Sequence, residues 1–353
     1  MRVTRSHHNP RIQPADVIPS SPAMQVIGVF NPGVACHNDE TVFLVRVAER
    51  PICKEGECLV PVFDAVSREI RIRRFLLADS KIDVSDARVV KTPEGNYLTS
   101  ISHLRVARLQ PDGSFRVDQQ PALMPQTEYE AYGIEDPRIT LIGDVYYVTY
   151  SAISDRGIVA ALATTRDFRE FERAGIIFHP DNKDVALFPS LSGGKYYALH
   201  RPSSSLYGRP EIWIAESEDL LCWGNHKHVM GVRPGSWDSG RIGASAVPFL
   251  TDYGWLEIYH GADEHNRYCL GAVLLDTEEP WKVLARSPSP ILTPEMPYET
   301  DGFFGKVVFS CGALVIGTDV QIFYGASDTS IASVEIPLSG ILEQLGVTIR
   351  EVV

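Results

Sequence analysis

The sequence predicts an all-β protein, and more narrowly a five-bladed β-propeller. Short strands rich in aromatic and β-branched residues recur along the chain at intervals of about 50 to 65 residues, a spacing typical of propeller blades. Turns with Gly, Asp or Asn precede most of these strands. Only residues 338–345 show a helical pattern, and that helix is expected to be short.

The elements follow one another in a regular order. Residues 1–23 are polar and rich in Pro, His and Ser, and we expect them to form an irregular N-terminal arm. Residues 24–353 contain no low-complexity linker, which predicts a single domain. Six copies of the strand pattern fit five blades if the first and last segments share one blade and so close the ring. The copies are residues 41–47, 96–102, 145–152, 195–201, 254–262 and 321–326.

Second strands are predicted directly after several of these copies, at residues 158–167, 211–217 and 268–276. A pair of two-sheet sandwiches is the alternative architecture, but the repeat spacing favours the propeller. In a propeller the innermost strands converge on a central channel. Polar residues at strand ends, such as Arg46, Arg201 and His260, would then lie close together although they are far apart in the sequence.

The segment Glu135-Asp136-Pro137-Arg138 stands out because two adjacent carboxylates precede a β-branched run, Ile139 to Tyr150, that predicts strand. A residue before proline is biased towards extended backbone, so we expect Asp136 to be extended. Successive side chains of extended backbone point to opposite faces, which predicts that Glu135 and Asp136 face different ways and leave one carboxylate free in a cleft. A turn whose acids cap backbone amides is the alternative interpretation.

Composition argues against several classes of partner. The chain carries 33 basic and 45 acidic residues, a formal charge of -12, and it has no basic tract. This charge opposes binding to nucleic acid or to anionic membranes. The N-terminus lacks the apolar stretch of a signal peptide, and the six scattered cysteines predict reduced thiols, so we expect a cytoplasmic protein.

The polar residues at strand ends favour binding of an anion. The candidate acids are Glu135, Asp136, Asp184 and Asp328, and the candidate cations are Arg46, Arg138, Arg201, Arg241 and His260. A hydrolytic glycosidase needs two carboxylates, whereas a phosphorolytic enzyme needs one acid and a cluster of cations that holds phosphate. Any single arginine could instead pair structurally with an acid, for example Arg138 with Glu135 or Asp184.

No cofactor is expected. The segments His226-Lys227-His228 and His37-Asn38-Asp39 lack a convincing third metal ligand, so we predict no metal site. The sequence contains no glycine-rich nucleotide-binding loop and no serine nucleophile elbow.

At this level the residues resemble a known family. Glu135-Asp136-Pro137-Arg138 is similar to the signature of glycoside hydrolase family 130, the inverting β-mannoside phosphorylases and β-mannosidases. Further similar segments extend over about residues 24–330. They include Asn31-Pro32-Gly33, Asn182-Lys183-Asp184, His200-Arg201-Pro202, Arg241-Ile242-Gly243, Tyr259-His260-Gly261 and Tyr324-Gly325-Ala326-Ser327-Asp328.

The resemblance implies a five-bladed propeller that performs inverting phosphorolysis of a β-mannoside, with inorganic phosphate as co-substrate and nucleophile. It implies that Asp136 is the general acid and passes its proton through the 3-hydroxyl of the mannosyl ring, and that the products are α-mannose 1-phosphate and the acceptor sugar. The implied phosphate ligands are Arg201, Arg241, His260 and Tyr268. Asn31, Arg46 and Asp328 resemble mannose contacts, and Glu135, Arg138 and Asp184 are placed in the same substrate-binding region.

Arg241 stands where the family often has lysine, which keeps the charge but changes the donor geometry. Because all the implied phosphate positions carry suitable residues, we favour a phosphorylase over an inverting β-1,2-mannosidase that uses water. A non-catalytic sugar-binding propeller is a further alternative. The acceptor sugar, the β-1,4 or β-1,2 linkage and any homo-oligomeric state stay open.

Overall fold

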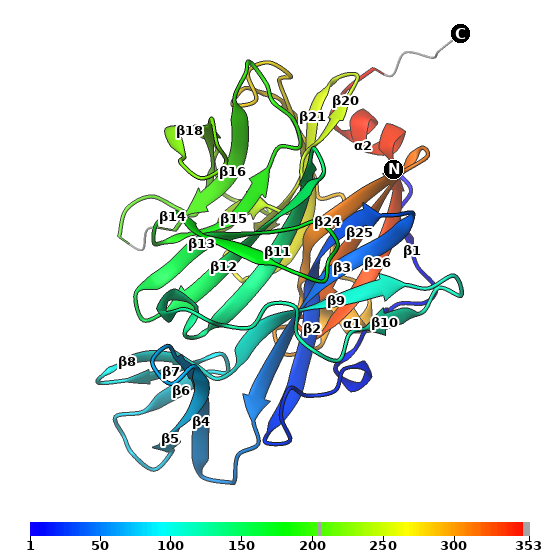
Figure 1. Cartoon of the computed structure of the whole chain (residues 1–353). Helices are drawn as coiled ribbons and strands as arrows, with labels where there is room; N and C mark the ends of the chain where they lie inside the picture. Colours follow the sequence, from blue (N-terminus) through cyan, green and yellow to red (C-terminus); the bar gives the residue numbers. More distant parts are fainter. Residues whose placement is uncertain (204–205, 349–353) are drawn as a thin grey trace.

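The computed structural model describes residues 1–203 and 206–348, and these residues form a mostly β protein (Figure 1). The prediction of the all-β class is confirmed. Five antiparallel sheets of four main strands follow one another along the chain, each built largely by consecutive strands. We number these sheets one to five in chain order.

Sheets one and two are joined by a single parallel bridge between Ser102 and Gly133. The strands of sheet one are β2 (Met24–His37), β3 (Glu40–Pro51), β9 (Ile101–Leu109) and β10 (Phe115–Val117). The strands of sheet two are β11 (Gly133–Ile142), β12 (Val145–Ser154), β13 (Gly157–Thr165) and β14 (Glu172–Phe178). The run predicted as one strand, Ile139 to Tyr150, is therefore a hairpin, because Gly143 adopts φ 64° and turns the chain.

Sheets three and four have the same antiparallel order. The strands of sheet three are β15 (Asn182–Leu187), β16 (Tyr196–Pro202), β17 (Ile212–Ser217) and β18 (Gly224–Met230). The strands of sheet four are β19 (Arg241–Ala244), β21 (Gly254–Ala262), β22 (Tyr268–Leu275) and β23 (Val283–Arg286), with the short β20 (Phe249–Thr251) paired to β21. The predicted second strands of sheets two, three and four correspond to β13, β17 and β22.

Sheet five joins the two ends of the chain, as predicted. Its strands are β24 (Val308–Ile316), β25 (Asp319–Ala326), β26 (Ser330–Pro337) and β1 (Thr4–Arg5). Thr4 pairs with Glu335 and Arg5 with Val334, so part of the arm predicted to be irregular is an edge strand (Figure 1). The helical elements are short: α1 (Pro297–Thr300), α2 (Leu338–Gln344), which was predicted, and the 3-10 turns η1 (Pro14–Asp16) and η2 (Glu128–Glu130).

An insertion between β3 and β9 forms a small separate lobe at the lower left of Figure 1. It consists of the hairpin β4 (Glu57–Asp64) and β5 (Glu69–Leu76) and the three-stranded sheet β6 (Asp83–Asp86), β7 (Val89–Thr92) and β8 (Gly95–Leu98). The predicted strand copy at residues 96–102 is therefore wrong, because β8 ends at Leu98 and β9 begins at Ile101. Five copies remain, and each one is the second strand of its sheet.

The hydrophobic cores lie between consecutive sheets. Ile139 packs with Leu44 between sheets one and two, and Leu162 packs with Leu187 between sheets two and three. Equivalent clusters lie between sheets three and four, four and five, and five and one. Each sheet therefore buries both faces against neighbouring sheets.

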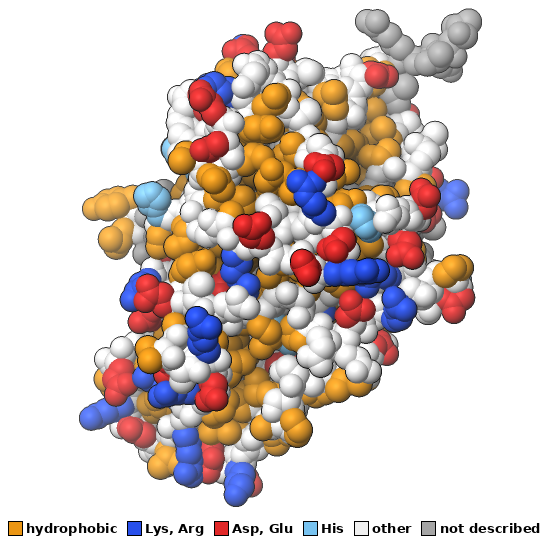
Figure 2. Space-filling model, viewed as in Figure 1, with side chains coloured by type: hydrophobic (Ala, Val, Ile, Leu, Met, Phe, Trp, Pro, Cys, Tyr) orange, Lys and Arg blue, Asp and Glu red, His pale blue; other side chains and the backbone are white. Residues whose placement is uncertain are grey.

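The surface, the helices and the cysteines add three observations. On the face shown in Figure 2, acidic and basic side chains are interspersed and do not form a patch of one sign. Within residues 1–203 and 206–348, no helix is long and apolar enough to cross a membrane. All six cysteines are free.

Candidate active site

Three first strands carry the same local irregularity. The pairing register shifts between Phe30 and Gly33 in β2, between Glu135 and Arg138 in β11, and between Lys183 and Ala186 in β15. Each shift holds a polar residue with left-handed backbone, at Asn31 (φ 49°), Asp136 (φ 53°) and Asp184 (φ 56°). Asn and Asp tolerate this conformation better than other side chains, and bulges often redirect side chains beside active sites.

The prediction that Asp136 is extended is therefore wrong. Its left-handed backbone, within the register shift, turns its side chain to the same side as that of Glu135. Both carboxylates contact the guanidinium of Arg46. The two acids do not face different ways, because the alternation of an extended strand is interrupted at this point.

The acidic part of the site is organised by Arg46, and we call it the Arg46 cluster (Asn31, Arg46, Glu135, Asp136 and Asp328). Arg46 Nη1 donates to Asp136 Oδ1 at 2.9 Å, and Asn31 Nδ2 donates to the same oxygen at 2.8 Å. Asp328 follows β25 in a turn, has φ 50°, and lies within electrostatic range of Arg46 and Asp136. One guanidinium group thus lies among three carboxyl groups and stabilises their negative charge.

Asp136 and Asp328, two acids of this cluster, have pKa values that are shifted in opposite directions. Burial acts to raise the pKa of Asp136, but Arg46, Lys183 and Arg138 outweigh it, and the pKa lies below its usual value. Burial raises the pKa of Asp328 to about 6, although Arg46 acts against the shift. Asp136 is therefore ionised in the ligand-free protein at neutral pH, whereas Asp328 titrates close to it.

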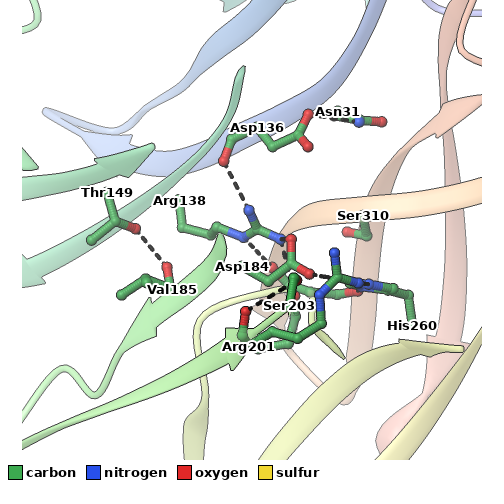
Figure 3. Close-up of polar contacts among 12 residues, drawn as sticks. Asn31, Asp136, Arg138, Thr149, Asp184, Val185, Arg201, Ser203, His260 and Ser310 are labelled. Atoms are coloured by element: carbon green, nitrogen blue, oxygen red, sulfur yellow. Dashed lines mark hydrogen bonds and ion pairs between the residues drawn. The ribbon is translucent and has the colours of Figure 1, made fainter. Parts of the chain in front are cut away.

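The basic part of the site surrounds Asp184, and we call it the Asp184 cluster (Arg138, Asp184, Arg201 and His260; Figure 3). Arg138 Nη2 lies 3.2 Å from Asp184 Oδ1, Arg201 Nη1 lies 3.1 Å from Oδ2, and His260 Nε2 lies 3.4 Å from Oδ2. Burial would raise the pKa of Asp184, but Arg201 and His260 outweigh it and hold the pKa well below its usual range. One carboxylate thus serves three basic side chains.

Arg138 connects the two clusters. Its side chain is only 1% exposed, and its Nη1 donates to the backbone oxygen of Asp136 at 2.9 Å. Its remaining donors reach Asp184 and the backbone oxygens of Ala244 and Ser245. Arg138 therefore pairs structurally with Asp184, one of the two acids considered for it, and all its observed contacts are within the protein.

Arg241 and Tyr268 form a separate pair beside the Asp184 cluster. Arg241 Nη1 donates to the Tyr268 hydroxyl at 3.1 Å, and its Nη2 donates to Asn266 Oδ1 at 2.8 Å. Arg241 begins β19 and Tyr268 begins β22 of the same sheet. This arginine therefore orients the tyrosine hydroxyl.

A cavity of about 300 Å³ joins the two clusters. Most of the predicted site residues line it, namely Asn31, Arg46, Glu135, Asp136, Asp184, Arg201, Tyr268 and Asp328. The other three, Arg138, Arg241 and His260, are not on its wall but contact residues that are. An acid and several cations therefore face one space that could hold a small polar ligand and an anion.

Two further cations in this wall were not predicted from the sequence. Lys183 lines the cavity next to Asp184, and its position within the segment Asn182-Lys183-Asp184 was the available signal. Arg88 comes from the turn between β6 and β7 of the insertion, and its guanidinium lies 4.3 Å from the centre of the Phe304 ring. No sequence signal pointed to Arg88, because its contact with Phe304 joins segments far apart in the chain.

Among the described residues, no group of three or more His, Cys, Asp or Glu side chains is arranged to hold a metal ion. The polar side chains that line the cavity bring carboxylates, guanidinium groups, one lysine and one tyrosine, and His260 lies behind them.

Comparison with known proteins identifies the family. A family profile of glycoside hydrolase 130, described as β-1,4-mannooligosaccharide phosphorylase, matches residues 75–346. The chain belongs to glycoside hydrolase family 130. The predicted family resemblance and the prediction of a β-mannoside phosphorylase are confirmed.

Individual members of family 130 are similar over most of this chain. β-1,2-Mannobiose phosphorylase of Listeria innocua serovar 6a is 48% identical over 352 residues, which cover 98% of this chain and 99% of that protein. A 1,2-β-oligomannan phosphorylase of Thermoanaerobacter sp. is 41% identical over 68% of this chain and 80% of that protein. A solved structure of the Listeria innocua enzyme in complex with β-1,2-mannobiose superposes with a TM-score of 0.95, at 47% identity, over 98% of this chain and 99% of that one.

Proposed function

We propose that this β-mannoside phosphorylase cleaves β-1,2-mannobiose with inorganic phosphate and releases α-mannose 1-phosphate and mannose. The observation that carries the choice of linkage is the 48% identity, over nearly the whole of both chains, to a β-1,2-mannobiose phosphorylase. The description of the family profile names β-1,4-linked mannooligosaccharides, so β-1,4-mannobiose is the second candidate substrate.

Asp136 acts as the general acid in this proposal. The 3-hydroxyl of the mannosyl ring gives its proton to the glycosidic oxygen as the bond to the anomeric carbon breaks, and it takes a proton from Asp136 in return. A general acid must hold its proton at that moment. Because the pKa of free Asp136 is lowered, the proposal requires that bound substrate weaken the pairing of Asp136 with Arg46.

The phosphate occupies the basic part of the cavity. Arg201 and Tyr268 line the wall, while Arg241 orients Tyr268 and His260 supports Arg201. Guanidinium groups bind phosphate through charge-assisted hydrogen bonds. From this position a phosphate oxygen attacks the anomeric carbon on the face opposite to the leaving sugar, which inverts the configuration. Lys183 adds a further cation to the cavity wall, within electrostatic range of Asp136.

The Arg46 cluster and the insertion hold the two sugars. Asn31, Arg46 and Asp328 are placed to bind hydroxyls of the mannosyl ring that is transferred. Arg88 and Phe304 provide a wall with one cation and one aromatic face for the leaving sugar.

The architecture we propose for this site is a five-bladed β-propeller within residues 24–353, to which the arm of residues 1–23 adds the edge strand β1. It is supported by five consecutive four-stranded sheets and by the hydrophobic core between each sheet and the next, including sheets five and one. The first strands β24, β2, β11, β15 and β19 contact one another in that order, as strands around a channel would.

The test compares β-1,2- and β-1,4-mannobiose with and without inorganic phosphate. We expect one mannose and one α-mannose 1-phosphate per molecule of β-1,2-mannobiose, only when phosphate is present, and little turnover of the β-1,4 isomer. Two free mannoses per disaccharide without phosphate would establish a β-1,2-mannosidase, and binding without turnover would establish a sugar-binding protein. Synthesis from α-mannose 1-phosphate across an acceptor panel identifies the leaving sugar independently.

A further inference from the structure

Ser245 lies behind the Asp184 cluster and has contacts in three directions. Its hydroxyl oxygen is 3.1 Å from Nδ1 of His260. Its backbone N–H donates to Glu257 Oε1 at 2.9 Å, and its backbone oxygen accepts from Arg138 Nε at 3.2 Å. Ser245 is fully buried, and its position is determined by these bonds from two different sheets.

The imidazole of His260 has little freedom to rotate. The ring is fully buried, and its centre lies 4.3 Å from that of Phe309. Gly243 also lies against the ring, since an added Cβ would lie 2.6 Å from Cε1 and 2.7 Å from Nε2. Nδ1 therefore stays against Ser245, and Nε2 stays against Asp184 and Arg201.

The ring carries a single proton, and its neighbours decide which nitrogen holds it. Burial lowers the pKa of His260 to about 4 although Asp184 acts in the opposite direction, so the imidazole is neutral at pH 7. The hydrogen bond made by one ring nitrogen sets the protonation of the other.

Placing the proton on Nε2 puts a donor against the carboxylate on one side of the ring and an acceptor against the serine hydroxyl on the other. Nε2–H would point to the ionised Asp184, whose Oδ2 is 3.4 Å away, and the Ser245 hydroxyl would donate to Nδ1. With the proton on Nδ1, the lone pair of Nε2 would face that carboxylate oxygen. Arg201 Nη1, 3.3 Å from Nε2, could then donate to the ring, but Asp184 is a closer and charged acceptor for it at 3.1 Å.

We propose that Ser245 is a positioning residue that holds the proton of His260 on Nε2, where it faces Asp184, so that the ring takes no hydrogen bond from Arg201, the guanidinium that binds the phosphate in the cavity. The role in the reaction rests on the proposed phosphate site, whereas the position of the proton does not. Without the serine hydroxyl, Nδ1 loses its donor, and the proton can move to Nδ1. Nε2 would then offer a lone pair, which repels Asp184 and can accept a hydrogen bond from Arg201 that would otherwise be available to the phosphate.

The experiment measures the tautomer directly by NMR of the full-length protein labelled with ¹⁵N-histidine, without substrate, at pH 7. The spectrum of the His260→Gln variant assigns the His260 signals. We expect the wild type to show a protonated Nε2 and an unprotonated Nδ1, and Ser245→Ala to move the proton partly or fully to Nδ1. Ser245→Thr keeps a hydroxyl and should restore the wild-type pattern.

Kinetics of the same variants complete the test. Ser245→Ala should raise the KM for phosphate by about 2- to 12-fold, the range of one neutral hydrogen bond, with a smaller change in the KM for mannobiose. Ser333→Ala is the matched control, because Ser333 is equally buried and its hydroxyl has no hydrogen-bond partner within the described structure.

A proton on Nδ1 in the wild type, or an unchanged tautomer in Ser245→Ala, would overturn the inference. The wild-type spectrum alone can do so even if the alanine variant does not fold. A shifted tautomer with an unchanged KM for phosphate would support the positioning by Ser245 and would instead remove His260 from the proposed phosphate site.

Discussion

The Arg46 cluster and the Asp184 cluster contain acidic and basic side chains in opposite proportions. In the first, one arginine lies among three carboxyl groups, and in the second, one aspartate lies among three basic side chains. Burying a charge costs free energy unless the charge is paired. Arg46 therefore stabilises the carboxylates around it, and Asp184 stabilises the basic side chains around it. The charge left unpaired is negative at the end of the cavity with the Arg46 cluster and positive at the end with the Asp184 cluster.

This difference explains how one cavity can hold both an acid and an anion. Excess carboxylate provides hydrogen-bond acceptors for sugar hydroxyls and a residue that can transfer a proton. Excess guanidinium provides donors for phosphate. Arg138 binds the backbone of Asp136 and the side chain of Asp184, and it therefore fixes the position of one end of the cavity relative to the other.

The largest expected effect tests the acidic end. Asp136→Asn keeps the shape of the side chain and removes its proton, so kcat for phosphorolysis should fall by about 10²- to 10⁴-fold. Steady-state release of α-mannose 1-phosphate measures this loss. Glu135→Gln is the matched control, because Glu135 binds the same guanidinium. Equal losses in the two variants would mean that the negative charge beside Arg46 matters and the proton of Asp136 does not.

The next effect tests the basic end. Arg201→Ala removes a charged donor from the cavity wall, and the KM for phosphate should rise by roughly 10- to 150-fold, the range for a hydrogen bond to a charged group. Arg241→Ala should raise it less, because Arg241 acts through Tyr268. The KM for mannobiose should change little in either variant. A larger rise in the KM for mannobiose than for phosphate would place the sugar, and not the anion, at this end.

The smallest expected effect is on stability, and it has opposite signs for Asp328 and Asp136, two acids of the Arg46 cluster. The raised pKa of Asp328, about 6, means that the folded state binds this proton more tightly than the unfolded state. The free energy of unfolding therefore falls as pH rises from about 4 to about 6, and the loss persists above pH 6. Asp328→Asn removes this cost and should stabilise the protein at pH 7 to 8 by about 1–3 kcal/mol.

Thermal unfolding at several pH values measures this gain, which should vanish below about pH 4. Asp136→Asn provides the contrast. Its lowered pKa means that the ionised carboxylate stabilises the fold above its unfolded pKa, so the asparagine variant should be less stable at pH 7. A loss of stability in Asp328→Asn at pH 7 would show that the Asp328 carboxylate is paired and not in excess.

Much of the fold follows from local patterns in the sequence. Aromatic and β-branched runs with turn residues between them are sufficient to predict the second strand of each sheet and the short C-terminal helix. Residues 96–102 misled the prediction because β8 of the insertion leads almost directly into β9, and a local pattern contains no information about the sheet that a strand joins. Strand pairing depends on partners that are distant in the sequence.

The sequence by itself was sufficient to predict most of the residues that line the cavity, because their order and spacing along the chain resemble those of one family. Only the tertiary structure decided how they pair. The left-handed backbone of Asp136 brings it to the same guanidinium as Glu135, and sheets two, three and four together surround Asp184 with Arg138, Arg201 and His260. Arg88 reaches the cavity from the insertion. These contacts depend on distances and desolvation between remote segments, which no local preference of the chain encodes.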